Sequence, residues 1–287
     1  MEDGQTEVGQ RAAFQPAAMK LGAQSVAVVT GAASGIGRAV VLELAKRGVA
    51  LAIIDIDSAG LTEVARTTAR CTPFVCDVRD PDAMARAADE IARSHGRVDL
   101  VVNNAGVSVA GSVEALTLAQ LQHAMDVNYW GVVHGCRAFL PALRATAAGG
   151  SHTAVCTVLS DFALFTLPTK SAYAASKHAA HAFTMALAAE LAGSGVTMTA
   201  VYPGATATAL VARGEAVDTE KQAREAAMLA RGLAPEKVAR RLVRAVERGR
   251  RRVLIGRDTR ILDLATRLAP GLAQAAVCRY WRRVPFL

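Results

Sequence analysis

The chain has 287 residues, of which 52% are hydrophobic and 20% are charged, and this composition excludes a disordered protein. Its formal net charge is +8, all of which comes from the ten arginines and two acids that follow residue 247. Because the rest of the chain is balanced in charge and contains no recognisable module that reads nucleic acid, we expect no nucleic-acid partner.

The N-terminal residues and the cysteines indicate in which cellular compartment the protein resides. Residues 1–20 begin with acidic side chains and lack an apolar core, unlike a secretory signal peptide, and no run of about 18 apolar residues could span a membrane. The five cysteines show neither CxxC nor metal-ligand spacing, which is typical of the reducing cytosol. We therefore expect a cytoplasmic protein without a metal site, and a flexible arm over residues 1–22.

Short apolar runs alternate with helix-prone segments along the chain. The runs predict strands at 25–30, 50–55, 73–78, 98–106, 152–160, 196–204 and 251–256. The intervening segments predict helices at 36–47, 58–70, 80–95, 115–145, 171–192 and 235–248. Continuous apolar strands separated by helices are typical of a parallel sheet covered on both faces. The sequence therefore predicts an α/β fold with a doubly wound parallel sheet of the Rossmann type, in three α/β/α layers.

The first predicted strand runs into the glycine-rich stretch TGAASGIG at 30–37. Its glycines, Gly31, Gly35 and Gly37, would let the backbone turn tightly and approach a pyrophosphate at the start of a helix. Thr30 and Ser34 could tie the turn together through side-chain hydrogen bonds. The alternative is a glycine-rich turn without a ligand, which the strand–loop–helix context disfavours.

The second predicted strand ends at Asp55, 18 residues after Gly37. A carboxylate at this place can accept hydrogen bonds from an adenosine ribose, and its charge repels a 2′-phosphate. No basic residue beside Asp55 or the glycine loop would hold such a phosphate, since Arg38 lies inside the following helix. The pattern favours NAD over NADP. The alternative for Asp55 is a helix cap or a solvated loop acid, and Asp57 is a nearby competitor for either role.

The stretch YAASK at 173–177 places Tyr173 and Lys177 four residues apart on a predicted helix, and therefore on one face. A free tyrosine has a pKa of about 10 and is a weak base at neutral pH. A nearby ammonium favours the phenolate, so this pair could transfer protons. Taken alone, the spacing also occurs by chance on surface helices.

Several short motifs follow one another at regular places in the chain. They are TGAASGIG, Asp55, CDV (76–78), NNAG (103–106), Asn128, Ser160, YAASK and YPGATAT (202–208). Together they resemble the short-chain dehydrogenase/reductase family in its single-domain branch, over roughly residues 24–256. The resemblance implies a catalytic domain at 23–257, a nicotinamide cofactor, hydride transfer at an alcohol carbon, and a homodimer or homotetramer built on the long helices.

The resemblance also implies roles for individual residues. The catalytic set is Asn128, Ser160, Tyr173 and Lys177, with Tyr173 as acid and base, Lys177 as its partner, Ser160 orienting the substrate and Asn128 holding a relay water. The cofactor set is Gly31, Ser34, Gly35, Ile36, Gly37, Asp55, Asp77, Val78, Asn104, Ala105, Gly106, Tyr173, Lys177, Pro203, Thr206 and Thr208. Asn103 would instead brace the sheet.

The chain departs from the family around Ser160. Leu159 stands where the family usually has an earlier hydroxyl, and Asp161 follows Ser160 directly. We favour a solvated loop acid for Asp161, with a polar contact to substrate as the alternative. The apolar side chains that follow predict a wall for a lipophilic substrate, or simple packing under the loop; they are Phe162, Leu164, Phe165 and Leu167. The charged, helix-prone segment after Thr208 lies where the family has a mobile lid.

Residues 258–287 form a basic C-terminal extension in which arginine alternates with apolar residues, and its end contains Tyr280, Trp281, Arg282 and Arg283. Such a segment can lie on an anionic membrane. Packing against the catalytic domain or a neighbouring subunit, with the arginines solvated, is the alternative.

These patterns predict an NAD-preferring oxidoreductase for a lipophilic secondary alcohol or ketone. One alternative is a catalytically silent member of the same fold that senses NAD. Another is a lyase or epimerase on the same scaffold, which would cause no net change in cofactor absorbance.

Overall fold

The computed structural model of the protein describes residues 18–281, and its centre is a parallel sheet of seven strands in the order β3-β2-β1-β4-β6-β7-β9. The strands are β1 (Val26–Thr30), β2 (Ala50–Asp55), β3 (Cys71–Val75), β4 (Leu100–Asn103), β6 (Thr153–Val158), β7 (Val196–Pro203) and β9 (Arg252–Ile255). The order reverses beside β1, between β1 and β4, and this arrangement is the doubly wound topology that the sequence predicts.

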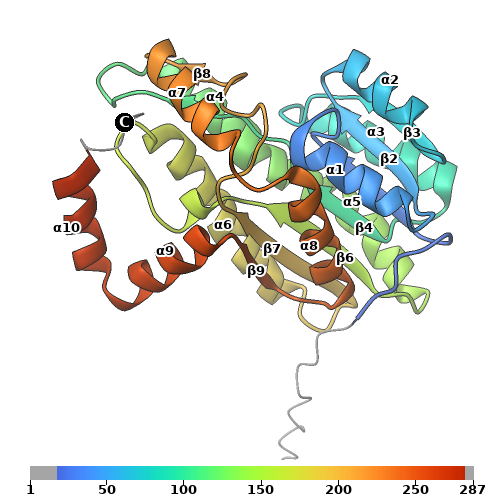
Figure 1. The fold of residues 1–287 in the computed structure, drawn as a ribbon. Coiled ribbons are helices and arrows are strands. Elements are labelled where there is room, and N and C mark those ends of the chain that lie inside the picture. The colour runs from blue at the N-terminus through green and yellow to red at the C-terminus, as the bar shows by residue number, and fades with distance from the viewer. Residues whose placement is uncertain (1–17, 282–287) are drawn as a thin grey trace, which may run out of the picture.

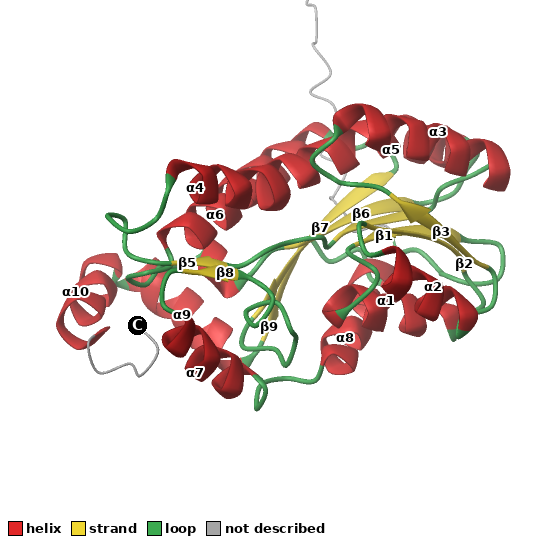
Figure 2. Ribbon diagram, turned by 90° about the horizontal axis from the view of Figure 1, so that it is seen from above, coloured by secondary structure: helices red, strands yellow, loops and turns green. Residues whose placement is uncertain are grey.

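Helices cover both faces of the sheet (Figures 1 and 2). One layer contains α1 (Gly35–Ala45), α2 (Ser58–Arg66) and α8 (Pro235–Glu247), and the other contains α3 (Pro81–His95), α5 (Gly131–Ala148) and α6 (Ser171–Glu190). Alternate residues of β1 point to opposite layers: Val29 belongs to the core under α1 and α8, and Val28 to the core under α3 and α5. Because both faces are buried, the strands read as unbroken apolar runs.

The predicted helix at 115–145 is divided in the structure. It consists of α4 (Leu118–Met125), one π-helical turn at Asp126–Trp130, and α5. The π turn adds a residue to the helical turn and carries Asn128, so the interruption lies at a predicted site residue. Two short strands that the sequence did not predict, β5 (Val109–Ala110) and β8 (Glu215–Ala216), pair in parallel beside it.

The domain begins earlier than the predicted boundary at residue 23. Leu21 is buried in the core, and the Met19 N–H donates to the Glu247 carbonyl at the end of α8. These contacts arise because Leu21 packs with the apolar side of α8, so residues 19–21 belong to the domain rather than to an arm. The rest of the predicted arm, residues 1–17, lies outside the described residues.

The C-terminal extension forms two helices, α9 (Arg257–Leu268) and α10 (Pro270–Tyr280). Thr259 and Asp263 of α9 are buried against the domain, and Asp263 accepts hydrogen bonds from Arg252 of β9 through both carboxylate oxygens. No residue of α10 is buried. The first part of the extension therefore packs on the domain, which was the alternative to membrane contact. Arg282 and Arg283 lie outside the described residues.

Three general expectations can be compared with the structure. All five cysteines are free thiols. Within residues 18–281, no cluster of three or more metal-ligating side chains is present. No helix in this part of the chain combines the length and the apolar character that crossing a bilayer requires.

Candidate active site

A cavity with a volume of about 620 Å³ lies at the carboxyl ends of the central strands, where parallel sheets bind ligands. Residues that follow β2, β4, β6 and β7 line it, together with the start of α1 and the segment between β7 and α8. Every predicted cofactor residue except Gly37 lines this cavity, as do Ser160, Tyr173 and Lys177 of the predicted catalytic set. Chain topology therefore brings together residues that are separated by up to 177 positions.

The glycine loop is held against the end of β4 by hydrogen bonds. Thr30 Oγ1 accepts from the N–H groups of Asn104 and Ala105 at 3.0 and 3.1 Å. The Asn104 amide donates to the carbonyls of Thr30 and Gly31 at 3.0 and 3.1 Å. Asn104 thus braces the loop as well as lining the cavity. The predicted tie through Thr30 is present, whereas Ser34 starts α1 without a side-chain capping hydrogen bond.

Two of the loop glycines are required by geometry. Gly31 has a φ of 64°, and a Cβ there would lie 2.7 Å from the Ala105 Cα. Gly37 does not line the cavity; a Cβ on it would lie 2.0 Å from the Gly31 carbonyl oxygen. Gly37 therefore permits α1 to start directly beneath the loop, and its predicted contact with a cofactor is indirect.

Asp55 and Asp57 have different surroundings. Asp57 caps α2 by accepting from the Gly60 N–H, whereas Asp55 accepts from the N–H groups of Ala33 and Asp57 at 3.0 and 3.1 Å. These bonds fix the Asp55 carboxylate at the cavity rim between β2 and the glycine loop. The helix-cap role, which was the alternative for Asp55, is therefore filled by Asp57.

Sequence reasoning missed one cation at this rim. Arg79 lines the cavity and forms hydrogen bonds to both carboxylate oxygens of Asp77, the closest at 2.6 Å. This pairing holds the pKa of the Asp77 carboxyl below its usual range. Arg38 instead pairs with Glu63 at 2.7 Å and does not line the cavity. Arg79 follows CDV by one position, but only the tertiary structure shows that it shares a cavity with Asp55.

Ser160, Tyr173 and Lys177 converge beneath this rim. The Lys177 Nζ lies 5.9 Å from the centroid of the Tyr173 ring and donates to the Val158 carbonyl at 3.3 Å. Ser160 lines the same cavity as Tyr173 and favours the phenolate, which opposes the effect of burial on the pKa of the phenol. Both Tyr173 and Lys177 are buried on the first two turns of α6, so helix geometry aligns them as the YAASK spacing predicts.

Burial dominates the electrostatics of this pair. It raises the pKa of the Tyr173 phenol above its ordinary value, and it lowers the pKa of the Lys177 ammonium to about 8. The negative charges of Asp161 and Glu225 add to the rise at Tyr173. The protein alone therefore opposes phenolate formation, and a positively charged group beside Tyr173 would have to offset that.

Asn128 lies behind the cavity rather than on its wall. Its amide donates to the Val107 carbonyl at 3.0 Å and the Ser176 hydroxyl at 2.9 Å, and its oxygen accepts from the Val107 N–H at 2.9 Å. A Cβ on Gly106 would lie 2.9 Å from that oxygen and 3.4 Å from the Lys177 Nζ. Asn128 thus connects the loop after β4 to α6, close to Lys177.

Aromatic and aliphatic side chains surround the phenol. The Phe162 ring stacks on Phe165 with centroids 5.0 Å apart and meets Tyr173 edge-on at 5.8 Å. Phe162, Phe165 and Leu167 line the cavity, and Leu164 packs in the core instead. Leu210, Val211, Met228 and Leu229 from the segment after Thr208 complete the apolar part of the lining.

Comparison with known proteins decides the family. Residues 25–218 match the family model described as short chain dehydrogenase. The chain belongs to the short-chain dehydrogenase/reductase family. It is a nicotinamide-dependent oxidoreductase that acts on CH–OH groups.

Individual relatives and solved structures agree with this assignment. The chain is 36% identical over 261 residues to a Mycobacterium tuberculosis protein named as the oxidoreductase SadH, covering 88% of this chain and 93% of that one. It is 36% identical over 216 residues to the 1-deoxy-11-beta-hydroxypentalenate dehydrogenase of Streptomyces exfoliatus, covering 71% and 77%.

Two crystal structures of short-chain dehydrogenases superimpose well on this chain. One, from Burkholderia phymatum, is a complex with NAD, with a TM-score of 0.77, 28% identity and coverage of 88% and 94%. The other, from Burkholderia cenocepacia, is a complex with NADP, with a TM-score of 0.74, 26% identity and coverage of 88% and 97%. The neighbours therefore support a nicotinamide cofactor of either kind.

Asp161 in this dehydrogenase is not the solvated loop acid that the sequence favoured. It is buried at the cavity, where its Oδ1 accepts from the Ser160 hydroxyl and the Phe162 N–H, each at 2.9 Å. Burial, strengthened by the charge of Asp258, raises the pKa of the Asp161 carboxyl to about 6. The prediction was wrong because the short 3-10 turn at Asp161–Ala163 folds the carboxylate inward, which no local pattern indicates.

The segment after Thr208 forms β8 and α7 (Thr219–Leu229) and lies against the cavity. One buried ion pair fixes it: Glu225 of α7 accepts a hydrogen bond from the Lys170 ammonium, and both side chains are buried. Neither residue stood out in the sequence, since a single Lys and Glu separated by 55 positions form no pattern. Asp258 of α9 was missed for the same reason; it lines the cavity and accepts from the Ala205 N–H at 3.1 Å.

Proposed function

We propose that this dehydrogenase transfers hydride between NAD and a lipophilic secondary alcohol or ketone. The observation that carries the proposal is the environment of the Tyr173 phenol: it shares its cavity with Ser160 and meets edge-on the Phe162 ring, on which Phe165 stacks. A proton-transfer group beside an apolar wall suits a carbonyl carbon that bears hydrocarbon substituents. A sugar would leave many hydroxyl groups against that wall without hydrogen-bond partners.

Nicotinamide, when bound, accepts or supplies the hydride. In our proposal Tyr173 removes the hydroxyl proton during oxidation and returns it during reduction. The Ser160 hydroxyl lies beside the phenol and donates to the substrate oxygen as negative charge develops there. With a pKa of about 8, the Lys177 ammonium is still mostly protonated at pH 7, and its charge favours the phenolate.

Asn128 acts in this proposal through position. Its amide is saturated by Val107 and Ser176, so it fixes the loop after β4 relative to α6 and holds Lys177 within reach of Tyr173. The relay-water role that the family resemblance implies would use the space beside Gly106 and Lys177.

Preference for NAD rests on Asp55, whose carboxylate would accept from ribose hydroxyls and repel a 2′-phosphate. Arg79 provides the case for NADP, because its guanidinium lines the same cavity. We favour NAD because both carboxylate oxygens of Asp77 already engage Arg79, and a 2′-phosphate would have to displace that bidentate pair.

Assembly and location belong to the same proposal. We infer a homodimer or homotetramer built on the long helices. Five free thiols are in keeping with a cytoplasmic location. We also infer peripheral membrane contact through α9 and α10, because these helices expose Leu264, Leu268 and Leu272. Sedimentation equilibrium of the purified protein tests the oligomer, and a monomer at micromolar concentration would contradict it.

The direct test is absorbance at the reduced-nicotinamide band. The protein is given NAD or NADP with steroid, retinoid, aliphatic and sugar alcohols in separate reactions. Turnover of one lipophilic class with NAD is expected, and Tyr173→Phe should lower kcat by about 10²-fold or more because the acid–base group is lost. Preferred turnover of sugars would overturn the substrate class. Cofactor binding without turnover of any alcohol would favour the silent NAD sensor.

A further inference from the structure

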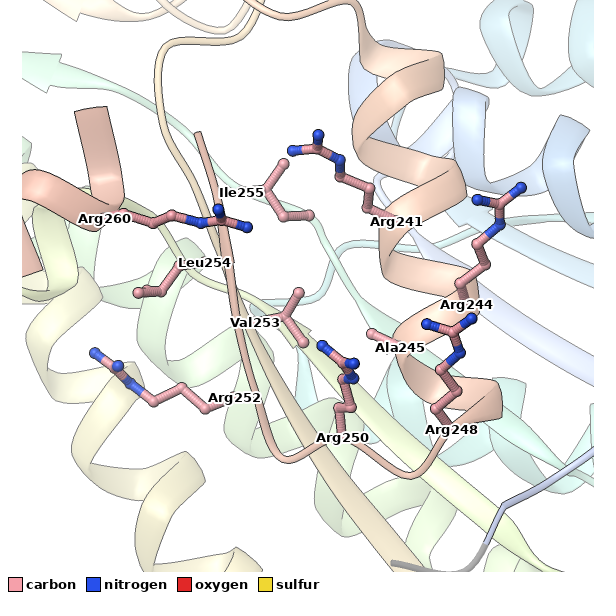
Figure 3. Close-up of a pocket in the computed structure, with 10 residues that line it drawn as sticks. All are labelled: Arg241, Arg244, Ala245, Arg248, Arg250, Arg252, Val253, Leu254, Ile255 and Arg260. Carbon is pink, nitrogen blue, oxygen red and sulfur yellow. The ribbon is translucent and has the colours of Figure 1, made fainter. Parts of the chain in front are cut away.

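A second cavity, of about 340 Å³, lies on the outer side of β9 between α8 and α9 (Figure 3). Six of its ten lining residues are arginines, and the rest are apolar. Arg241, Arg244 and Arg248 come from α8 or its end, Arg250 and Arg252 from the turn and strand that follow, and Arg260 from α9. Figure 3 shows the side chains of Arg241 and Arg260 on opposite sides of the strand. We refer to this cavity as the arginine pocket.

The charge of the arginine pocket is not balanced within the described residues. Arg252 is neutralised by Asp263, to which it donates two hydrogen bonds. In residues 18–281 the other five arginines have no ion pair, and no acidic side chain lines the pocket. The arginines are exposed, so solvent screens their mutual repulsion, but their concentrated positive charge attracts an anion.

Helix electrostatics do not explain the arrangement. Arg241, Arg244 and Arg248 recur at spacings of three and four on one face of α8, where like charges destabilise a helix. Arg248 lies at the C-terminal end, where a cation is favourable, but Arg260 lies near the N-terminal end of α9, where a cation is unfavourable. A ligand that bridges the two helices accounts for both placements.

The residue type indicates the ligand. All six cations of the pocket are arginines and none is lysine. The guanidinium group presents a fixed fork of N–H donors that matches two oxygens of a phosphate. The five unpaired arginines are exposed but gathered in one pocket, so they favour a compact anion of high charge, such as a phosphate group, which carries about −1.5 to −2 as a monoester at neutral pH. Two or three linked phosphates would balance the pocket, and a single carboxylate would not.

A second copy of the chain is a poorer occupant. β9 is the edge strand of the sheet, so another strand could add to it. Two copies that met at this edge in a symmetric pair would, however, bring their arginine pockets together, and the like charges would oppose association.

We propose that the arginine pocket binds an oligophosphate group, carried either by a soluble molecule or by the headgroup of a phosphorylated lipid. The pocket is distinct from the candidate active site: Arg260 lines the former, and Asp258, two positions earlier on α9, lines the latter. Ile261 and Leu264 follow Arg260 on the same helix and are exposed, so a lipid source would place them near hydrocarbon.

The first test is calorimetric titration with inorganic triphosphate at low salt, without NAD or NADP, since their own linked phosphates would compete for the arginine pocket. One triphosphate per chain is expected. Arg241→Gln/Arg260→Gln should weaken binding at least tenfold. The matched control Arg240→Gln/Arg257→Gln removes the same charge from the same two helices outside the pocket and should bind as the unaltered protein does. No binding, or equal loss in both double variants, would overturn the proposal, provided that thermal unfolding shows both variants folded.

The second arm separates the two sources. Vesicles of phosphatidylcholine with 5% phosphatidylinositol 4,5-bisphosphate are sedimented with each protein in the presence and absence of triphosphate. Co-sedimentation that is lost in Arg241→Gln/Arg260→Gln and displaced by triphosphate assigns the pocket to a lipid headgroup. Triphosphate binding without co-sedimentation assigns it to a soluble ligand. These outcomes do not depend on turnover, so they remain separable from the failure of the proposed dehydrogenase substrate.

Discussion

The Ser160 hydroxyl donates a hydrogen bond to the adjacent Asp161 carboxylate, 2.9 Å away, inside the candidate active site. Both residues share the cavity with Tyr173, and both affect the pKa of its phenol: Ser160 lowers it and the charge of Asp161 raises it. When Asp161 is ionised it competes with substrate for the Ser160 proton, and its charge raises the pKa of Tyr173. Protonation of Asp161 would remove both effects. We therefore expect the rate of the proposed reaction to depend on the ionisation of Asp161, whose pKa is about 6.

Replacing Asp161 by Asn should therefore change the pH profile of kcat/KM. Asn keeps an oxygen that accepts from Ser160 but cannot ionise, so the ionisation near pH 6 should disappear, and kcat/KM at pH 8 should rise severalfold over the unaltered enzyme. The control is Asp57→Asn, at the same cavity but exposed, where Asn caps the helix equally well. An unchanged ionisation near pH 6 in Asp161→Asn would show that another group is responsible.

The same substitution should alter the pH dependence of stability. The pKa of Asp161 is raised from 3.8 to about 6, so the unfolded chain loses this proton first as pH rises, and the folded state loses stability between these values. Between pH 4.5 and 7.5 the unaltered protein should lose about 2 kcal/mol of unfolding free energy relative to Asp161→Asn. Urea unfolding at the two pH values measures the difference, and parallel behaviour of the two proteins would contradict the burial of an acid at this position.

Sequence patterns predicted the parts of the site that depend on strands and helices. The glycine loop, Asp55 and the YAASK pair follow from strand ends and from the helical turn, Ser160 follows from the family resemblance, and all of them line the cavity. The burial of Asp161 depends on how a loop folds against the site, which apolar periodicity does not encode. The π turn at Asn128 escaped prediction because its residues fit an ordinary helical pattern.

The choice of cofactor can be shifted at the rim. Asp55→Ser should remove the charge that repels a 2′-phosphate, and Asp77→Asn should release Arg79 to hold one. We expect the double variant to lower the NAD:NADP ratio of kcat/KM by about 10²-fold, since each charge effect contributes roughly 1–2 kcal/mol. Initial rates with both cofactors give the ratio. Adding Arg79→Gln should reverse much of the shift. An unchanged NAD:NADP ratio in both variants would show that Asp55 and Arg79 do not determine the choice of cofactor.

Gly37 should be intolerant of a side chain even though it lines no cavity. A Cβ there would lie 2.0 Å from the Gly31 carbonyl oxygen and 2.5 Å from the Asn104 Nδ2, which donates to that oxygen and so holds the loop in place. Gly37→Ala should weaken NAD binding at least tenfold and cost about 1–3 kcal/mol of stability. Gly271→Ala is the control, because Gly271 has open space around it and lies at the start of α10. Equal NAD affinity of Gly37→Ala and the unaltered protein would show that the loop can relax.

The buried pair of Lys170 and Glu225 should control the segment that covers the cavity. Glu225→Gln leaves the Lys170 ammonium buried without its counter-charge, which costs about 3–5 kcal/mol in typical buried pairs. Part of that cost can be avoided if α7 moves away and lets water reach Lys170. We therefore expect faster proteolysis within residues 209–231 and a raised KM for substrate in Glu225→Gln, measured with and without NAD. Cofactor and substrate together should slow proteolysis of the unaltered protein.

Lys170→Met/Glu225→Leu separates the charge from the packing. Two apolar side chains of similar length fill the same space without a buried charge, so protease resistance should return towards that of the unaltered protein. Arg224→Gln, on the exposed side of the same helix, should leave both KM and proteolysis unchanged, because the pair of Arg224 with Glu220 is solvated. If Glu225→Gln is cleaved no faster than Arg224→Gln, the ion pair does not hold α7 in place, and the closure of the cavity must depend on the apolar contacts of Met228 and Leu229 instead.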